Sequence, residues 1–72
     1  MKGETKDLVG DHPKFLGIAE VAKRIGLCGA SIHRMEREGD FPTGFYVTPR
    51  RKVWIESEVV TWQMMKIAEA RA

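Results

Sequence analysis

Apolar residues between positions 18 and 25 repeat at helical spacing. They occupy positions i, i+3, i+4 and i+7 of one helix face: Ile18, Val21, Ala22 and Ile25. Gly17 suits an N-cap and Glu20 stands at the N3 position of a capping box. Gly26 suits the left-handed residue that ends a helix. The pattern therefore predicts a short helix over residues 18–25.

A second helical pattern begins a few residues later. Cys28, Ile32 and Met35 fall at i, i+4 and i+7 and are expected to face inward. This spacing predicts a helix from about Gly29 to Glu38. Because so short a connection separates the two helices, they should cross steeply, as in a helix-turn-helix.

The outer face of the second helix, which is expected to carry Ala30, His33, Arg34 and Arg37 toward DNA, combines small residues with basic ones. Three small residues begin it: Gly29, Ala30 and Ser31. Such residues allow close approach to base edges in a major groove, and Arg34 has the reach and fork geometry for a guanine. Arg37 is better placed for a phosphate. The alternative is a solvated helix whose arginines pair with neighbours such as Glu38, and on which His33 is an ordinary surface histidine.

Two strand-like runs follow a break at Phe41-Pro42, because the residue before proline avoids the helical region. Residues 45–47 and 53–55 are rich in aromatic and branched side chains, and residues 48–52 join them in a hairpin. The connection carries consecutive positive charges: Arg50, Arg51 and Lys52. Like charges crowded at a hairpin tip oppose folding but suit contact with a phosphate backbone. The alternative is a solvated turn.

The last part of the chain predicts a helix that closes the core. Ser57 is expected as its N-cap, with Glu58 favourable near the helix dipole. Trp54, Val59 and Trp62 are expected in the core, because so small a domain needs its large aromatic residues inside. The alternative is that the tryptophans are stacking platforms for bases.

The same helix carries a second apolar stripe. Val60, Met64 and Ile67 fall at i, i+4 and i+7, away from the residues assigned to the core. Two interpretations remain open. The stripe is either a contact between subunits, or it packs on the first helix or the N-terminal arm of its own chain.

The order helix, tight turn, helix, hairpin and final helix is that of a winged helix-turn-helix, mainly α with a small β-hairpin. The net charge of +2 is small but unevenly distributed: residues 14–52 contain eight basic and four acidic residues, and the remainder contains four basic and six acidic ones. The positive region coincides with the predicted helix-turn-helix and hairpin, where a surface that contacts phosphates would need it.

A chain of 72 residues makes one small domain. We expect residues 1–13 to form a flexible N-terminal arm and residues 14–72 the DNA-binding domain, with residues 14–16 as a short extended piece against the core. A basic arm for the minor groove is the alternative, which the three acidic residues of the arm disfavour. Since no signal-peptide core or membrane-length apolar run is present, we expect a cytoplasmic, nucleoid-associated protein.

An enzyme fits this sequence poorly. Cys28, the single cysteine, excludes an intrachain disulfide. Cys28 and His33 are a nucleophile and a base close in sequence, but five helical steps place them about 140° apart. No carboxylate cluster, phosphate-binding glycine loop or Cys/His metal spacing is present. We therefore expect no catalytic residues, no cofactor and no metal.

Several segments, in this order, resemble the AlpA-like regulators of phages and prophages, and more broadly the small excisionase and MerR-type winged-helix domains. The segments are residues 18–26, Ser31-Ile32 with Arg34, residues 39–42, Pro49-Arg50, and Trp54 followed by residues 57–59 and Trp62. The resemblance covers about residues 15–62. It implies a transcriptional regulator, or an architectural factor that bends DNA so that an integrase excises a mobile element. It places the recognition helix at residues 29–38, with Ser31 and Arg34 toward DNA, and the wing at Arg50-Arg51.

The sequence also departs from these families. Cys28 stands in place of the usual Ser or Thr cap, Gly29 in place of a long basic side chain, and His33 in place of Tyr. Lys52 replaces a usual apolar residue, which leaves the hairpin register open. These departures leave the operator sequence unassigned.

The resulting hypothesis is a sequence-specific DNA-binding protein, either a phage-type transcriptional regulator or an excisionase-like recombination factor. Its expected partners are double-stranded DNA and either an integrase or a second copy of itself. The alternative is a protein-interaction module on the same fold, such as an anti-repressor or a regulator inhibitor. That module would tolerate loss of Arg34 and Arg50, whereas a DNA binder would not.

Overall fold

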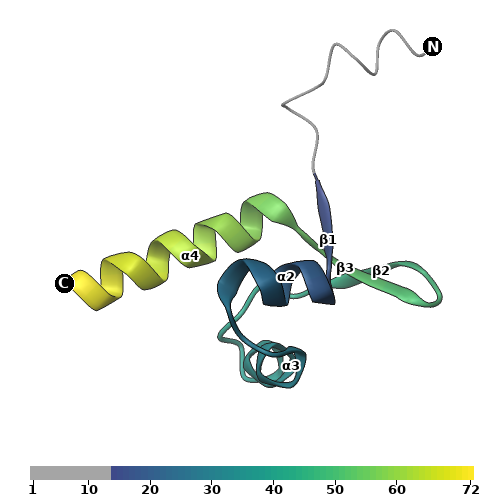
Figure 1. Ribbon diagram of the computed structural model, residues 1–72, viewed down its shortest axis with the longest axis horizontal. Coiled ribbons are helices and arrows are strands. Elements are labelled where there is room, and N and C mark those ends of the chain that lie inside the picture. Colours follow the sequence, from purple (N-terminus) through teal and green to yellow (C-terminus); the bar gives the residue numbers. More distant parts are fainter. Residues whose placement is uncertain (1–13) are drawn as a thin grey trace, which may run out of the picture.

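The computed structural model describes residues 14–72, and the predicted N-terminal arm lies outside the described residues (Figure 1). The elements in chain order are β1 (Phe15–Gly17), α2 (Ile18–Ile25), α3 (Gly29–Arg37), β2 (Phe45–Thr48), β3 (Arg51–Ile55) and α4 (Glu56–Arg71). The three strands form one antiparallel sheet in the order β1-β3-β2. The predicted fold class, a mainly α winged helix-turn-helix with a small hairpin, is confirmed.

The ends of α2 follow the predicted caps. The backbone N–H of Gly17 donates to Oε1 of Glu20 at 2.7 Å, which is the acidic half of a capping box. Gly26 adopts a left-handed conformation with φ of 77°, and its N–H donates to the carbonyl of Ala22 at 2.8 Å. Local sequence therefore fixes both ends of this helix.

The predicted inward position of Cys28 is wrong. Cys28 is exposed and is the N-cap of α3, with an extended backbone at φ −79° and ψ 161°. A residue with this backbone lies outside the helix, so the 100° helical step does not apply to it. Ile32 is fully buried and Met35 is half-buried against the core, as predicted.

The start of α4 also differs from the prediction, because the helix begins at Glu56 with Ile55 as N-cap and Ser57 lies inside its first turn. Strand β3 leads directly into the helix, and Ile55 is still paired with Phe15 of β1. The N–H of Glu56 donates to the carbonyl of Lys14 at 2.7 Å. The carbonyl of the residue before β1 thus satisfies the first N–H of α4, one of the groups that a helix start leaves without an intrahelical partner.

The hairpin is tighter than predicted. Strand β2 extends to Thr48 and β3 begins at Arg51, so that only Pro49 and Arg50 form the turn. The pairing of β2 with β3 is irregular between Tyr46 and Thr48. Of the three basic residues assigned to the connection, two are therefore strand residues.

The core lies between the sheet and the helices. Its buried residues are Leu16, Val21, Ile32, Phe41, Trp54 and Val59, with Trp62 packed against them. The indole N–H of Trp54 donates to the carbonyl of Pro42 at 2.9 Å, and that of Trp62 to the carbonyl of Asp40 at 2.6 Å. Because Trp54 is fully buried, its ring is not available to stack on a base.

Helix α4 projects beyond the rest of the domain at its C-terminal end (Figure 1). Residues from Met64 to Ala72 are all exposed. Among residues 14–72, no helix is long and apolar enough to cross a membrane.

Candidate nucleic-acid interface

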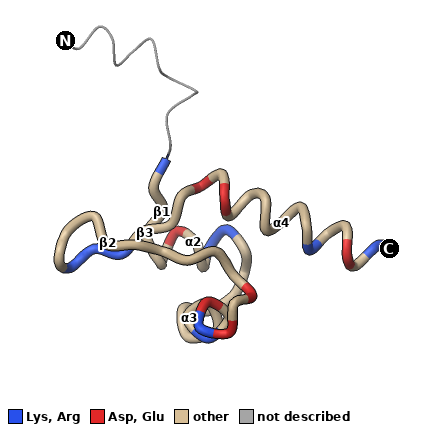
Figure 2. Tube along the Cα trace, turned by 180° about the vertical axis from the view of Figure 1, so that it is seen from behind, with Lys and Arg blue, Asp and Glu red and all other residues tan. Residues whose placement is uncertain are grey.

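A hollow of about 270 Å³ lies between α3 and the β2–β3 hairpin. Its lining comes from both elements and from the start of α2: Ile18, His33, Tyr46, Arg50, Arg51, Lys52 and Trp54. The structure thus brings the three predicted hairpin cations together with His33 of the predicted recognition helix. Figure 2 shows the basic positions of the hairpin and of α3 along the chain. Such a cationic hollow could contact a phosphate backbone.

The two arginines of the hairpin have different surroundings. Arg50 is exposed in the turn, where its backbone N–H lies 3.4 Å from Oγ1 of Thr48. Arg51 lies across the junction of β1 and α2, with Nη2 3.8 Å from Oε1 of Glu20. A Cβ atom at Gly17 would lie 3.3 Å from the Arg51 guanidinium, so glycine leaves space for it. Both arginines therefore keep side-chain surface toward solvent.

Lys52 already has a partner within the protein. Its Nζ lies 2.7 Å from Oε1 of Glu36 and 5.3 Å from the centre of the Trp54 ring, and its side chain is 25% exposed. A cation held in this way contributes less to phosphate contact than the exposed arginines, because binding DNA would compete with an existing ion pair.

Glu36 is a residue of this site that the sequence reasoning missed. Its side chain is 10% exposed and it accepts hydrogen bonds from Lys52 Nζ and from the Gly44 backbone N–H, each at 2.7 Å. A Cβ at Gly44 would lie 2.8 Å from Cε2 of Trp54, so only glycine permits this close approach. Glu36 therefore connects α3 both to the loop before β2 and to β3.

The ionisation of Glu36 follows from these contacts. Burial raises the pKa of Glu36. The hydrogen bonds from Lys52 and Gly44, together with the charges of Lys52 and His33, lower the pKa by more than burial raises it. The net pKa of Glu36 is therefore below its usual range. The sequence carried one signal for this pair. Glu36 comes one helical turn after the buried Ile32, and Lys52 stands where the family resemblance described above implies an apolar residue.

The outer face of α3 divides into two parts. Ala30, Arg34 and Arg37 are exposed, and neither arginine forms an ion pair within residues 14–72. The pairing with Glu38 that belonged to the alternative interpretation is therefore not found in the described part. His33 turns toward the hairpin instead, half-buried with its ring centre 6.0 Å from that of Trp54.

The beginning of α3 is more crowded than its middle. Gly29 is half-buried, and a Cβ there would lie 3.4 Å from Cγ1 of Ile18. Position 29 thus lies against α2, where a Cβ would make a close van der Waals contact with Ile18. Ser31 is half-buried with its hydroxyl 3.4 Å from Sγ of Cys28, and side-chain and backbone hydrogen bonds from Ser31 lower the pKa of the Cys28 thiol.

These elements define a small winged helix-turn-helix protein, with an arginine-bearing second helix beside a basic hairpin. The sequence model described as prophage CP4-57 regulatory protein (AlpA) matches residues 14–67. The chain therefore belongs to the AlpA family of phage regulatory proteins.

A relative from Enterobacteria phage P4, described as uncharacterized protein ORF88, is 33% identical over 55 residues. The match covers 76% of this chain and 62% of that protein. No solved structure is significantly similar to this chain.

Proposed function

We propose that this AlpA-family protein binds double-stranded DNA, with α3 in the major groove and the β2–β3 hairpin on the phosphate backbone. The observation that carries the proposal is the arrangement around the hollow between α3 and the hairpin. Exposed Arg34 and Arg37 belong to α3, and exposed Arg50 and Arg51 belong to the hairpin. Arginines on two adjoining elements can contact base edges and phosphates at the same time.

Within this proposal the site residues have different roles. Arg34 contacts a guanine, and Arg37, Arg50 and Arg51 contact phosphates. Ala30 and Ser31 lie close to base edges. Gly29, His33 and Lys52 support the interface from inside, because each packs against or binds another part of the protein.

The finer role is regulation of a phage or prophage promoter, or of excision together with an integrase. Nuclease protection distinguishes these roles. Protection of the region upstream of the protein's own gene is expected for promoter control, and protection of the attachment site for excision. Absence of any protected sequence in both regions would contradict a sequence-specific DNA-binding function.

Binding should depend steeply on salt. If about four to six basic side chains reach phosphates, at about 0.9 per phosphate, log K should fall against log[salt] with a slope of about −4 to −5. Fluorescence anisotropy on a labelled duplex measures this slope. A flat dependence would contradict the proposed phosphate contacts.

Arg34→Ala and Arg51→Ala should weaken binding in different ways. Loss of Arg34 is expected to cost about 1–3 kcal/mol on the protected site and to relax sequence preference, whereas loss of Arg51 should weaken all sequences about equally. Lys66→Ala, which removes a basic residue of α4, is the matched control and should leave DNA binding unchanged. Equal losses on specific and random DNA for Arg34→Ala would refute the recognition-helix assignment.

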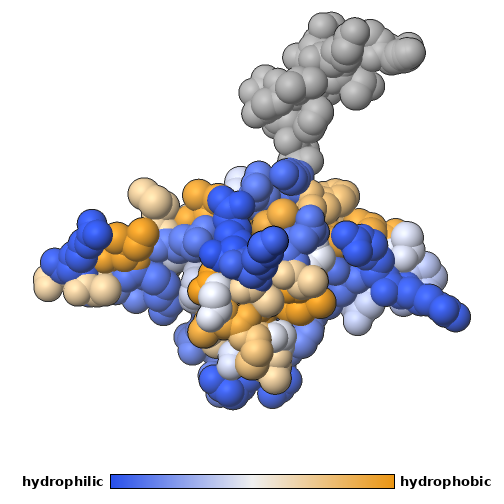
Figure 3. Space-filling model, in the orientation of Figure 1, coloured by the Kyte–Doolittle hydropathy of each residue, from blue (hydrophilic) through white to orange (hydrophobic). Residues whose placement is uncertain are grey.

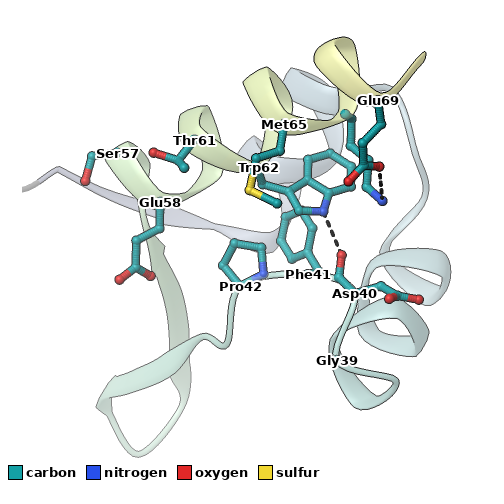
Figure 4. A pocket seen from close by; sticks show the side chains of 11 residues that line it. Gly39, Asp40, Phe41, Pro42, Ser57, Glu58, Thr61, Trp62, Met65 and Glu69 are labelled. Atoms are coloured by element: carbon teal, nitrogen blue, oxygen red, sulfur yellow. Dashed lines mark hydrogen bonds and ion pairs between the residues drawn. The ribbon is translucent and has the colours of Figure 1, made fainter. Parts of the chain in front are cut away.

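A second function, contact with another protein, is favoured by a separate groove of about 640 Å³ (Figure 4). The groove lies between the loop after α3 and one face of α4, and Phe41, Pro42, Trp62 and Met65 form its apolar part. Its lining carries three acidic residues, Asp40, Glu58 and Glu69, and one basic residue, Lys66, whose Nζ lies 3.4 Å from Oε1 of Glu69. A basic segment with apolar anchors would fit this surface. If the protein acts by contact with another protein, Arg34→Ala and Arg50→Ala should leave binding of that partner unchanged.

A further inference from the structure

The outer stripe of α4 is an exposed apolar feature that the proposed DNA contacts leave unused. Met64 is 62% exposed and Ile67 is 46% exposed, and Val60, one turn earlier, is half-buried. The alternative in which this stripe packs on the chain's own first helix is therefore wrong for Met64 and Ile67. The alternative in which it packs on the N-terminal arm lies outside the described residues. Figure 3 shows hydrophobic surface along the projecting helix, beside hydrophilic residues at its end.

The position of the stripe makes its exposure costly. Helices in small proteins derive most of their stability from packing an apolar face, and the last turns of α4 extend past the sheet without such a contact. Exposed apolar side chains clustered on one helix face are typical of a surface that another chain covers.

Charged residues mark both ends of the stripe. Glu56, Val60, Met64, Ile67 and Arg71 follow one another at spacings of four, four, three and four residues. They therefore lie on one face, with a negative charge at the start of α4 and a positive charge at its end. Arg24 Nη1 binds Oε2 of Glu56 at 3.1 Å, while Arg71 forms no ion pair within residues 14–72.

We infer that a second copy of this chain covers the stripe, with the two α4 helices packed antiparallel about a two-fold axis near Met64. In this arrangement Val60 lies opposite Ile67 of the second copy, and Glu56 lies opposite Arg71 of the second copy. A parallel arrangement would instead place like charges together at each end. The charge distribution along the stripe is thus complementary to itself only in the antiparallel direction.

This inference does not depend on DNA binding. None of the stripe residues belongs to the hollow between α3 and the hairpin. Self-association can therefore be measured on the protein alone, and its absence would leave the proposed DNA contacts untouched.

Sedimentation velocity without DNA, from about 10 µM to about 1 mM, tests the inference. The wild-type chain should sediment as a concentration-dependent mixture of monomer and dimer. Met64→Glu with Ile67→Glu should remain monomeric across this range and keep the helical circular dichroism signal. Met65→Glu is the matched control. Met65 lies on the same helix and is 52% exposed, but it faces the groove, so its replacement should leave the dimer intact.

Arg71→Glu tests the direction of packing. It should weaken the dimer about fivefold by placing like charges together at both ends. A monomeric wild type would overturn the inference, as would equal disruption by Met65→Glu or unfolding of the double variant. An unchanged dimer in Arg71→Glu would overturn the antiparallel arrangement.

Discussion

The basic face formed by α3 and the hairpin and the outer stripe of α4 are organised in opposite ways. The basic face is braced from within: Glu36 joins α3 to the hairpin, and Trp54 lies beneath both. The outer stripe has no comparable support beyond the first turns of α4. The first arrangement fixes side-chain positions before a ligand arrives, whereas the second leaves apolar surface for another chain to bury.

The largest expected effect comes from Trp54, which lies beneath α3 and the hairpin. Trp54→Ala should lower the free energy of unfolding by about 3–5 kcal/mol, because it leaves a cavity and removes the donor to the Pro42 carbonyl. Thermal denaturation followed by circular dichroism measures the loss. Trp62→Phe, at a partly buried position, is the control and should cost less. If Trp54→Ala melted like the wild type, the basic face would not depend on Trp54 for its support.

A smaller loss of stability is expected from a change at Glu36, which supports the basic face and does not belong to the outer stripe of α4. Glu36→Gln is expected to lower the free energy of unfolding by about 1–3 kcal/mol at pH 7, because it removes the acceptor charge for Lys52. The matched control is Glu38→Gln. Glu38 is an exposed acidic residue at the C-cap of the same helix, and its replacement should change stability little.

The effect of Glu36 should depend on pH. Its pKa in the folded protein is lowered, so its contribution is present above the unfolded-state pKa of about 4.3 and is lost as the pH falls through the folded-state pKa. Urea denaturation at a series of pH values should therefore show the wild type and Glu36→Gln converging below about pH 4. A difference that stayed constant down to pH 3 would argue against the ion pair as its origin.

The smallest effect is expected on α4. Lys66 Nζ lies 3.4 Å from Oε1 of Glu69, and both side chains are largely exposed. Lys66→Ala should change the free energy of unfolding by only about 0.2–0.5 kcal/mol, since exposed helical ion pairs contribute little. A loss above 1 kcal/mol would mean that the end of α4 is braced as firmly as the basic face.

The sequence was most informative where local residues decide the structure. The start and end of α2 depend on Gly17, Glu20 and Gly26, which lie within or beside that helix. The burial of Trp54 follows equally directly from the need of a small domain for a large apolar core.

Predictions failed where a distant segment intervenes. Helix α4 begins at Glu56, before Ser57, because β3 runs directly into it, and Lys14, more than forty positions earlier, accepts the first N–H of the helix. Within the site, the exposed arginines of α3 could be predicted from helical spacing. The contact of Glu36 with Lys52 depends on the turn of the hairpin and on the register of β3, which spacing alone does not determine.

The contact of Glu36 with Gly44 and Lys52 has a consequence for how sequence preference can change. Because α3 and the hairpin are tied together, a side chain at position 44 would have to displace Trp54 or the β3 backbone and would thereby shift α3 relative to the hairpin. In the proposed DNA complex, such a shift would change how α3 lies in the groove without altering any side chain proposed to contact a base. Gly44 would then act on sequence preference indirectly, through the position of α3.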